Sequence, residues 1–184
     1  MNRRMSTKRM VYLSLLMVLS IVLTRMLSIR IPLFGVEGIR IGIGGLPIIF
    51  AGVVFGPWAG GIVGALSDVV GFWVNPMGAY MPHFTLTSFL TGFIPGFIIF
   101  MIFRKDNTSY WKLLIAIGVG QTITSILLVP YFIHILFGAP YRPLLIPRLI
   151  GQPLHIIVYP ILIRMLLGHN MVYDAVQTVQ NEGA

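Results

Sequence analysis

Apolar residues of the chain fall into long runs, separated by short segments rich in charge, glycine and proline. A run of about 20 apolar residues crosses a hydrocarbon core of about 30 Å as a helix, which also satisfies its own backbone hydrogen bonds. The pattern therefore predicts an all-α integral membrane protein, a single domain over residues 1–184 with six transmembrane helices. Their expected spans are residues 10–29, 46–55, 58–72, 83–103, 113–136 and 148–167.

The basic residues predict which ends of the helices face the cytoplasm, since Lys and Arg concentrate in cytoplasmic loops. With the N-terminus inside, an even number of spans returns the C-terminus to the cytoplasm. The residues then expected inside are Arg3, Arg4, Lys8, Arg9, Arg104, Lys105, Lys112 and Arg164, and those expected outside are Arg25, Arg30, Arg40, Arg142 and Arg148. We expect Arg25, near the end of the first span, to snorkel outward to the interface.

Every cation on the predicted outer face is an arginine, and Glu37 is the one acid in the predicted outer loops. A guanidinium forms a rigid fork that binds carboxylates through two hydrogen bonds, whereas lysine is a hydrated point charge. The outer face therefore suits an anionic ligand, with Arg30, Arg40 and Arg148 as candidate contacts. The alternative is that these arginines bind only lipid headgroups.

Asp68 stands inside an apolar run, in the stretch GALSDVVGFWVNPMGAYMPHFTLTSFLTGFIPG from Gly64 to Gly96. A carboxylate within a membrane span is costly, so it indicates a functional site. Pro57, at the predicted cytoplasmic turn, precedes Asp68 by eleven residues, or about 17 Å of helix at ~1.5 Å per residue. This height places Asp68 at the floor of an outward-facing pocket. Alternatively, Asp68 caps a helix or hydrogen-bonds to a neighbouring one.

The segment after Asp68 is dense in aromatic and polar residues where the chain turns at the outer face. Aromatic rings suit stacking on a planar ligand, and side-chain amides and imidazoles supply hydrogen bonds. The candidate ligand contacts in this segment are Trp73, Asn75, Tyr80, His83 and Phe84.

Small residues recur at four-residue spacing through the second and third predicted spans, at Gly52, Gly56, Gly60 and Gly64. Small residues at this spacing allow helices in lipid to approach closely. The pattern predicts tight packing within the protein. Docking of another subunit on the same surface is the second interpretation.

The composition excludes several classes of protein. With 57% hydrophobic and 10% charged residues and a mean hydropathy of +0.89, the chain is too apolar for a soluble domain, and its net charge of +8 does not form a nucleic-acid-binding stripe. There are no cysteines, and the histidines, at positions 83, 134, 155 and 169, lack metal-ligand spacing. No nucleotide-binding loop or hydrolase motif is present. We therefore predict no enzyme activity, no cofactor and no bound metal.

The combined pattern resembles the membrane-embedded S components of energy-coupling factor (ECF) vitamin importers, and within them the folate-specific members. The resembling stretches are KRMVYLSLLMVLSIVLTRMLSI and IRIGIGGLPIIFAGVVFGPWAGGIVGALSD with its continuation to Gly96. They cover roughly the first 100 residues, and the last two spans add little beyond hydropathy.

The resemblance implies that the protein captures a vitamin on the outer face of the plasma membrane and docks onto a transmembrane coupling subunit that carries two cytoplasmic ATPases. It implies further that the protein topples in the membrane to release its cargo. Related proteins carry an Ala-x-x-x-Ala pattern on the first helix for docking, where this chain has Ser14 and Val18, and valine departs from the pattern. Ser14, Val18, Gly56 and Gly60 are the candidate docking residues.

Folate also fits the residues directly. Its pterin presents adjacent N–H donors that suit one carboxylate, such as Asp68, and its glutamate tail suits arginine. Capture of another vitamin remains an alternative, as does a noncatalytic assembly subunit of a membrane complex. A response to no small molecule at all would favour the assembly subunit.

Overall fold

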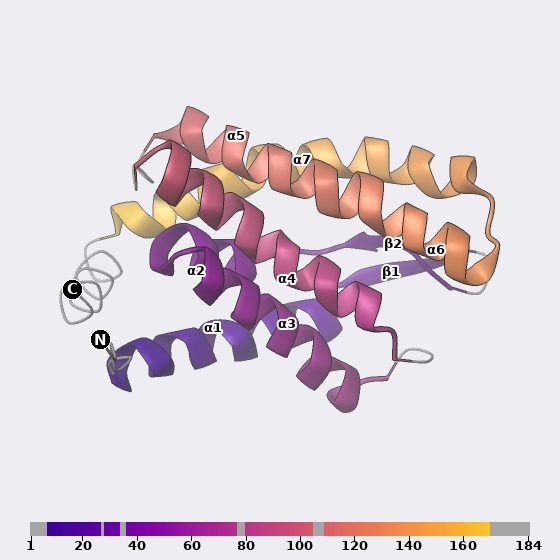
Figure 1. Cartoon of the computed structure of the whole chain (residues 1–184), viewed down its shortest axis with the longest axis horizontal. Coiled ribbons are helices and arrows are strands. Elements are labelled where there is room, and N and C mark those ends of the chain that lie inside the picture. Colours follow the sequence, from indigo (N-terminus) through magenta and orange to yellow (C-terminus); the bar gives the residue numbers. More distant parts are fainter. Residues whose placement is uncertain (1–6, 27, 34–35, 77–79, 105–108, 170–184) are drawn as a thin grey trace.

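A computed structural model describes residues 7–26, 28–33, 36–76, 80–104 and 109–169. The elements are α1 (Thr7–Arg25), β1 (Ile29–Leu33), β2 (Val36–Ile41), α2 (Leu46–Phe55), α3 (Pro57–Val74), α4 (Pro82–Phe97), the π-helix η1 (Ile98–Ile102), α5 (Tyr110–Gln121), the π-helix η2 (Thr122–Leu128), α6 (Val129–Phe137) and α7 (Tyr141–Gly168). Because η1 continues α4, and η2 joins α5 to α6, the described residues form six helical rods (Figure 1).

The all-α membrane architecture predicted from hydropathy is confirmed. In the described part of the chain, five rods are long and apolar enough to cross a membrane, and α2 is a shorter apolar helix. With 10 residues, α2 is about 15 Å long at 1.5 Å per residue, or half of a hydrocarbon core of about 30 Å. The helix α2 therefore extends along only about half of the thickness of the membrane core.

Two segments differ from the sequence-based expectation. The predicted first outer loop contains an antiparallel hairpin of β1 and β2. The sequence predicts a third outer loop up to Pro147, but α7 already begins at Tyr141. Proline is compatible with the first turn of a helix, where its missing N–H has no intrahelical acceptor. Pro143 therefore lies within α7 without ending it.

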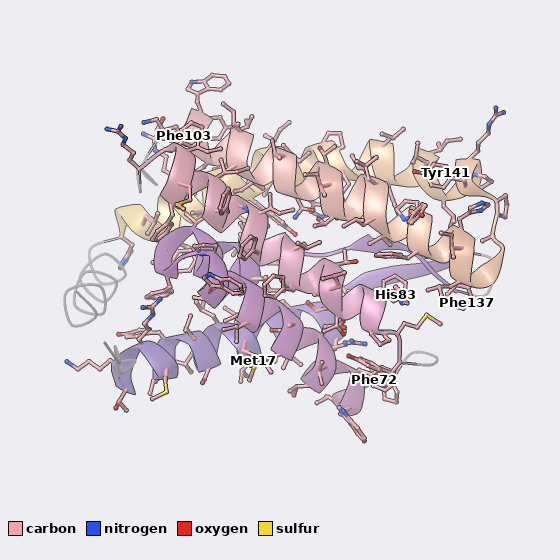
Figure 2. All side chains as sticks on the ribbon, in the orientation of Figure 1. Met17, Phe72, His83, Phe103, Phe137 and Tyr141 are labelled. Carbon is pink, nitrogen blue, oxygen red and sulfur yellow. The ribbon has the colours of Figure 1, made fainter. Side chains whose placement is uncertain are left out.

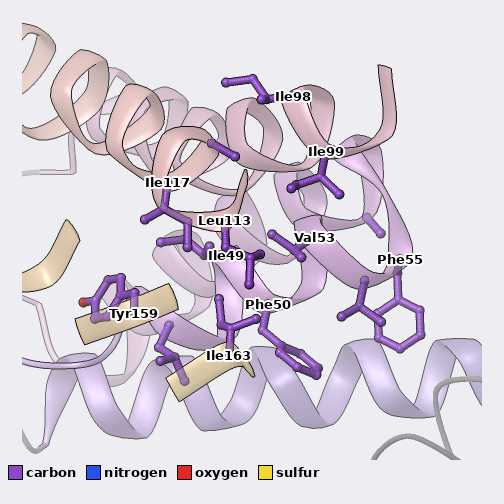
Figure 3. Close-up of a cluster of buried hydrophobic side chains, with 14 residues drawn as sticks. Ile49, Phe50, Val53, Phe55, Ile98, Ile99, Leu113, Ile117, Tyr159 and Ile163 are labelled. Atoms are coloured by element: carbon purple, nitrogen blue, oxygen red, sulfur yellow. The ribbon is translucent and has the colours of Figure 1, made fainter. Parts of the chain in front are cut away.

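The main hydrophobic core surrounds α2, all of whose residues are buried. Figure 3 shows Ile49 and Val53 of α2 among buried residues of its neighbours, including Ile99 of η1, Leu113 of α5 and Ile163 of α7. A helix that is apolar on every side requires apolar neighbours on every side. Here η1, α5 and α7 supply these apolar neighbours.

Glycines let α2, α3 and α4 approach backbone to backbone. A Cβ on Gly60 would lie 2.4 Å from the Cα of Gly52, and one on Gly92 would lie 2.3 Å from the carbonyl oxygen of Gly60. This is the internal packing that the small-residue spacing predicts, and Gly60 is buried in it. Gly56 is buried in the turn between α2 and α3 and has a φ of 102°, a conformation that favours glycine.

The two ends of the bundle differ in composition. One end of the bundle contains the start of α1, the end of α7 and Phe103 (Figures 1 and 2). At this end, Arg9 Nη2 donates to the carbonyl of Phe55, 2.7 Å away. The hairpin, His83, Phe137 and Tyr141 lie toward the opposite end (Figure 2). The basic residues of the first end orient it toward the cytoplasm. We call it the inner end and the other the outer end.

Candidate ligand-binding site

The inward-facing residues of the long helices change from apolar to polar midway along the bundle. On α7, Tyr159 and Ile163 are buried in the core, whereas Arg148, Gln152 and His155 share the same helix face nearer the outer end. The hydroxyl of Tyr159 would lie 3.5 Å from a Cβ on Gly45, the residue just before α2, so this change occurs at the level where α2 begins. The polar side chains belong to the half of the bundle beyond α2.

The segment that joins the hairpin to α2 is held from two sides. Ser20 Oγ on α1 donates to the carbonyl of Gly44 at 2.9 Å, and the Tyr159 hydroxyl on α7 donates to that of Gly42 at 3.1 Å. These bonds satisfy backbone acceptors that would otherwise lack partners away from water. They fix the hairpin at the end of α2 that faces the polar half of the bundle.

Asp68 lies in this polar half and has several partners. Thr85 Oγ1 on α4 donates to Asp68 Oδ2 at 2.7 Å, and the hydroxyl of Tyr80 is 2.8 Å from the same Thr85 oxygen. Arg25 Nη2 lies 3.6 Å from Asp68 Oδ1, and their side chains are 8% (Arg25) and 21% (Asp68) exposed. A carboxylate has about four lone-pair sites, so Asp68 can accept further hydrogen bonds.

The prediction that Arg25 snorkels outward is wrong. Its guanidinium turns inward to Asp68 and also donates to the carbonyls of Asn75 at 3.2 Å and Asp68 at 3.4 Å. A charge inside a membrane protein lowers its cost by pairing with the opposite charge. Arg25 stands near the outer end of one apolar run and Asp68 in the outer half of another, and this pair of opposite charges in neighbouring spans is the signal that could have identified the contact.

A second polar cluster connects η2 with α7. Gln121, at the end of α5, is 6% exposed, and its Oε1 accepts a hydrogen bond from Ser125 Oγ at 3.0 Å. Arg148 Nη1 on α7 donates to the Ser125 carbonyl at 3.4 Å. Arg148 is one of the predicted ligand contacts, whereas Gln121 and Ser125 are not among them. Residues four apart lie on the same face of a helix, so Gln121 and Ser125 face α7 together.

Three of the predicted contacts, Tyr80, His83 and Phe84, each pack against a different neighbour. The Tyr80 ring centroid is 5.3 Å from that of Phe72, and the His83 ring is 5.0 Å from that of Phe132 on α6. Phe84 packs against a buried cluster formed by Ile133, Ala139 and Leu144. Trp73, in contrast, is 81% exposed and joins neither polar cluster.

Arg30 and Arg40 are direct partners in the register of the hairpin. The side chains of both strands lie outside the described part of the structure. The register alone places the two predicted anion-binding residues opposite each other.

The remaining predicted docking residues lie on the surface of α1. Ser14 is exposed and Val18 is 52% exposed, beside the exposed side chains of Leu15 and Leu19. Within the described residues, no group of three His, Asp or Glu side chains could hold a metal ion.

Comparison with known proteins finds one family repeatedly. A family model described as "ECF-type riboflavin transporter, S component" matches residues 4–172. The "Folate transporter FolT" of Clostridium novyi (strain NT) is 37% identical over 153 residues, which cover 81% of this chain and 84% of that protein.

Two solved structures have a similar fold. The crystal structure of FolT bound with folic acid superposes with a TM-score of 0.71 and 25% identity, over 86% of this chain and 90% of the other. The structure of an S component of a bacterial ECF transporter superposes with a TM-score of 0.56 and 21% identity, over 93% of this chain and 96% of the other.

Proposed function

The chain belongs to the S components of ECF transporters, and we propose that the vitamin it captures is folate. As a member of this family it is a multi-pass membrane subunit of a bacterial transporter and not an enzyme. The description of the family model names riboflavin. The relative at 37% identity is named a folate transporter, and the structure with a TM-score of 0.71 is that of FolT bound with folic acid. The chemistry of the polar half must decide between these ligands.

The single observation that carries the proposal is the position of Asp68. Its carboxylate is held by Thr85 and Arg25 and has acceptor capacity left. The pterin of folate presents an amino group next to a ring N–H, so two donors can meet the two oxygens of one carboxylate. The flavin of riboflavin presents a single N–H between two carbonyls, and those carbonyls would be repelled by a carboxylate. A partly buried carboxylate with acceptor capacity left therefore favours the pterin.

The glutamate tail of folate requires cations, and the hairpin offers Arg30 and Arg40. Like charges directly opposite each other in an antiparallel pair are destabilising. An anion bound beside both residues would remove that repulsion. We assign the tail to this pair, with Arg40 as the stronger contact because it lies nearer to α2.

Transport requires a partner in this proposal. The chain carries no nucleotide-binding loop, so uptake against a gradient would be driven by an ECF coupling subunit and two ATPases. The exposed face of α1 around Ser14 and Val18 supports docking at this helix. Serine is small enough for a second helix to approach closely, whereas Val18 departs from the Ala-x-x-x-Ala pattern of related proteins.

Identification of the natural ligand tests the proposal. The protein is purified from cells grown on a mixture of vitamins, and the small molecule that accompanies it is identified by mass spectrometry. We expect a folate. Riboflavin in its place would assign the chain to the vitamin in the family description, and no ligand under any condition would favour an assembly subunit.

A further inference from the structure

We propose that the side-chain amides of Gln121 and Gln152 bind the amide that joins the aminobenzoyl group of folate to its glutamate. This inference rests on the proposed function and concerns the middle of the ligand. It adds a recognition element on α5 and α7 to the pterin contact at Asp68 and the tail contact at the hairpin.

The two glutamines lie at the same level of neighbouring antiparallel helices. Two contacts bracket them: a Cβ on Gly118 would lie 3.5 Å from Cγ2 of Ile156, and Arg148 Nη1 lies 3.4 Å from the carbonyl of Ser125. Gln121 lies between Gly118 and Ser125, and Gln152 lies between Arg148 and Ile156. The antiparallel register therefore places Gln121 beside Gln152.

The two side chains offer complementary groups. Gln121 Oε1 accepts from Ser125 Oγ, and the amide N–H groups of Gln121 are the donors that it can offer to a ligand. Gln152 Oε1 is buried and has no hydrogen-bond partner among the described residues. A buried acceptor without a donor is destabilising, and such an atom in a binding region indicates a donor that arrives with the ligand.

One donor and one acceptor on facing helices match an amide, –CO–NH–, of which the C=O accepts from Gln121 and the N–H donates to Gln152. They do not match a carboxylate, because its oxygens would be repelled by the bare oxygen of Gln152. Folate contains a lactam in its pterin and an amide in its link to glutamate. Because the pterin donors are assigned to Asp68, we assign the glutamines to the link.

The test compares folate with pteroate, which keeps the pterin and the aminobenzoyl group but ends in a carboxylate instead of the amide. Gln152→Leu in the full-length purified protein should weaken folate binding about tenfold, because the amide N–H of the ligand loses its acceptor. Pteroate has no N–H at this position and its carboxylate would no longer meet the oxygen of Gln152, so its affinity should not fall. Thr122→Val, on the exposed face of η2 at the same level, is the matched control and should change neither affinity.

A second variant keeps the test decisive if Gln152→Leu folds poorly. Gln152→Glu retains an acceptor, so folate binding should survive while pteroate binding weakens through repulsion between carboxylates. Equal losses of folate and pteroate in both Gln152 variants would overturn the assignment, as would no loss of folate in Gln152→Leu. Failure of the wild-type protein to bind folate would instead refute the proposed function.

Discussion

Replacement of Asp68 by asparagine tests the centre of the site with the smallest change of shape. In the ligand-bound variant, the introduced amide would accept from one pterin donor and turn its own N–H toward the other. Hydrogen bonds to charged groups contribute about 1.5–3 kcal/mol each, and leaving a buried donor unpaired adds to the loss. We expect folate binding to weaken by about 2 to 5 kcal/mol, or roughly 30-fold to several thousandfold in Kd.

The same substitution should also destabilise the ligand-free protein. Removal of one partner from a buried ion pair typically costs about 3–5 kcal/mol. Arg25 is 8% exposed but retains the backbone carbonyls at positions 68 and 75 as acceptors. We therefore expect a smaller loss, of about 1–3 kcal/mol.

Calorimetric titration with folate measures the first effect, and thermal unfolding without ligand measures the second. Ser67→Ala is the matched control, because Ser67 is the buried neighbour of Asp68 and its Oγ donates only weakly to the Met17 carbonyl, at 3.4 Å. The control should bind folate within about twofold of the parent. If Asp68→Asn binds folate within about threefold of the parent, Asp68 is a structural residue and the pterin assignment is wrong.

The hairpin, the surface of α1 and the glycine contact between α2 and α3 can each be tested by one substitution. Arg40→Ala should weaken folate more than a pterin without the glutamate tail, and equal losses in titrations would show that the arginine supports the hairpin instead. Ser14→Trp should abolish uptake in vesicles that contain the full complex yet leave folate affinity largely intact, whereas parallel losses would show that Ser14 supports the fold. Gly60→Ala should lower the thermal unfolding temperature, because its Cβ would meet the α2 backbone, while Gly151→Ala, with nothing within 4 Å of its Cβ, should not. Equal effects of the two glycine substitutions would contradict the internal contact.

The six-helix architecture could be predicted because hydropathy and backbone hydrogen bonding permit few alternatives in lipid. The prediction of Asp68 as a site residue uses the same reasoning, since a carboxylate in a span is costly. Which side chains surround Asp68 depends on which face each helix turns toward its neighbours. Thr85 reaches Asp68 because α3 and α4 pack through glycines, which hydropathy alone does not specify.

The errors have a similar origin. Arg25 lies close to the predicted interface, and sequence position alone cannot distinguish a side chain that extends to water from one that turns to an acid on another helix. The roles of Gln121 and Ser125 are hard to predict because the sequence does not show which side of this long apolar segment faces α7. The hairpin escapes prediction because its strands are short and contain glycine and proline, which weakens the periodic signal.

Direct comparison of folate with riboflavin tests most sharply whether this S component captures folate on its own. The purified wild-type protein is titrated with each vitamin in the absence of ATP and of any partner, and the folate complex is then challenged with an excess of riboflavin. We expect saturable folate binding at one site and no displacement by riboflavin. Saturable binding of riboflavin that folate cannot displace would contradict the proposed function.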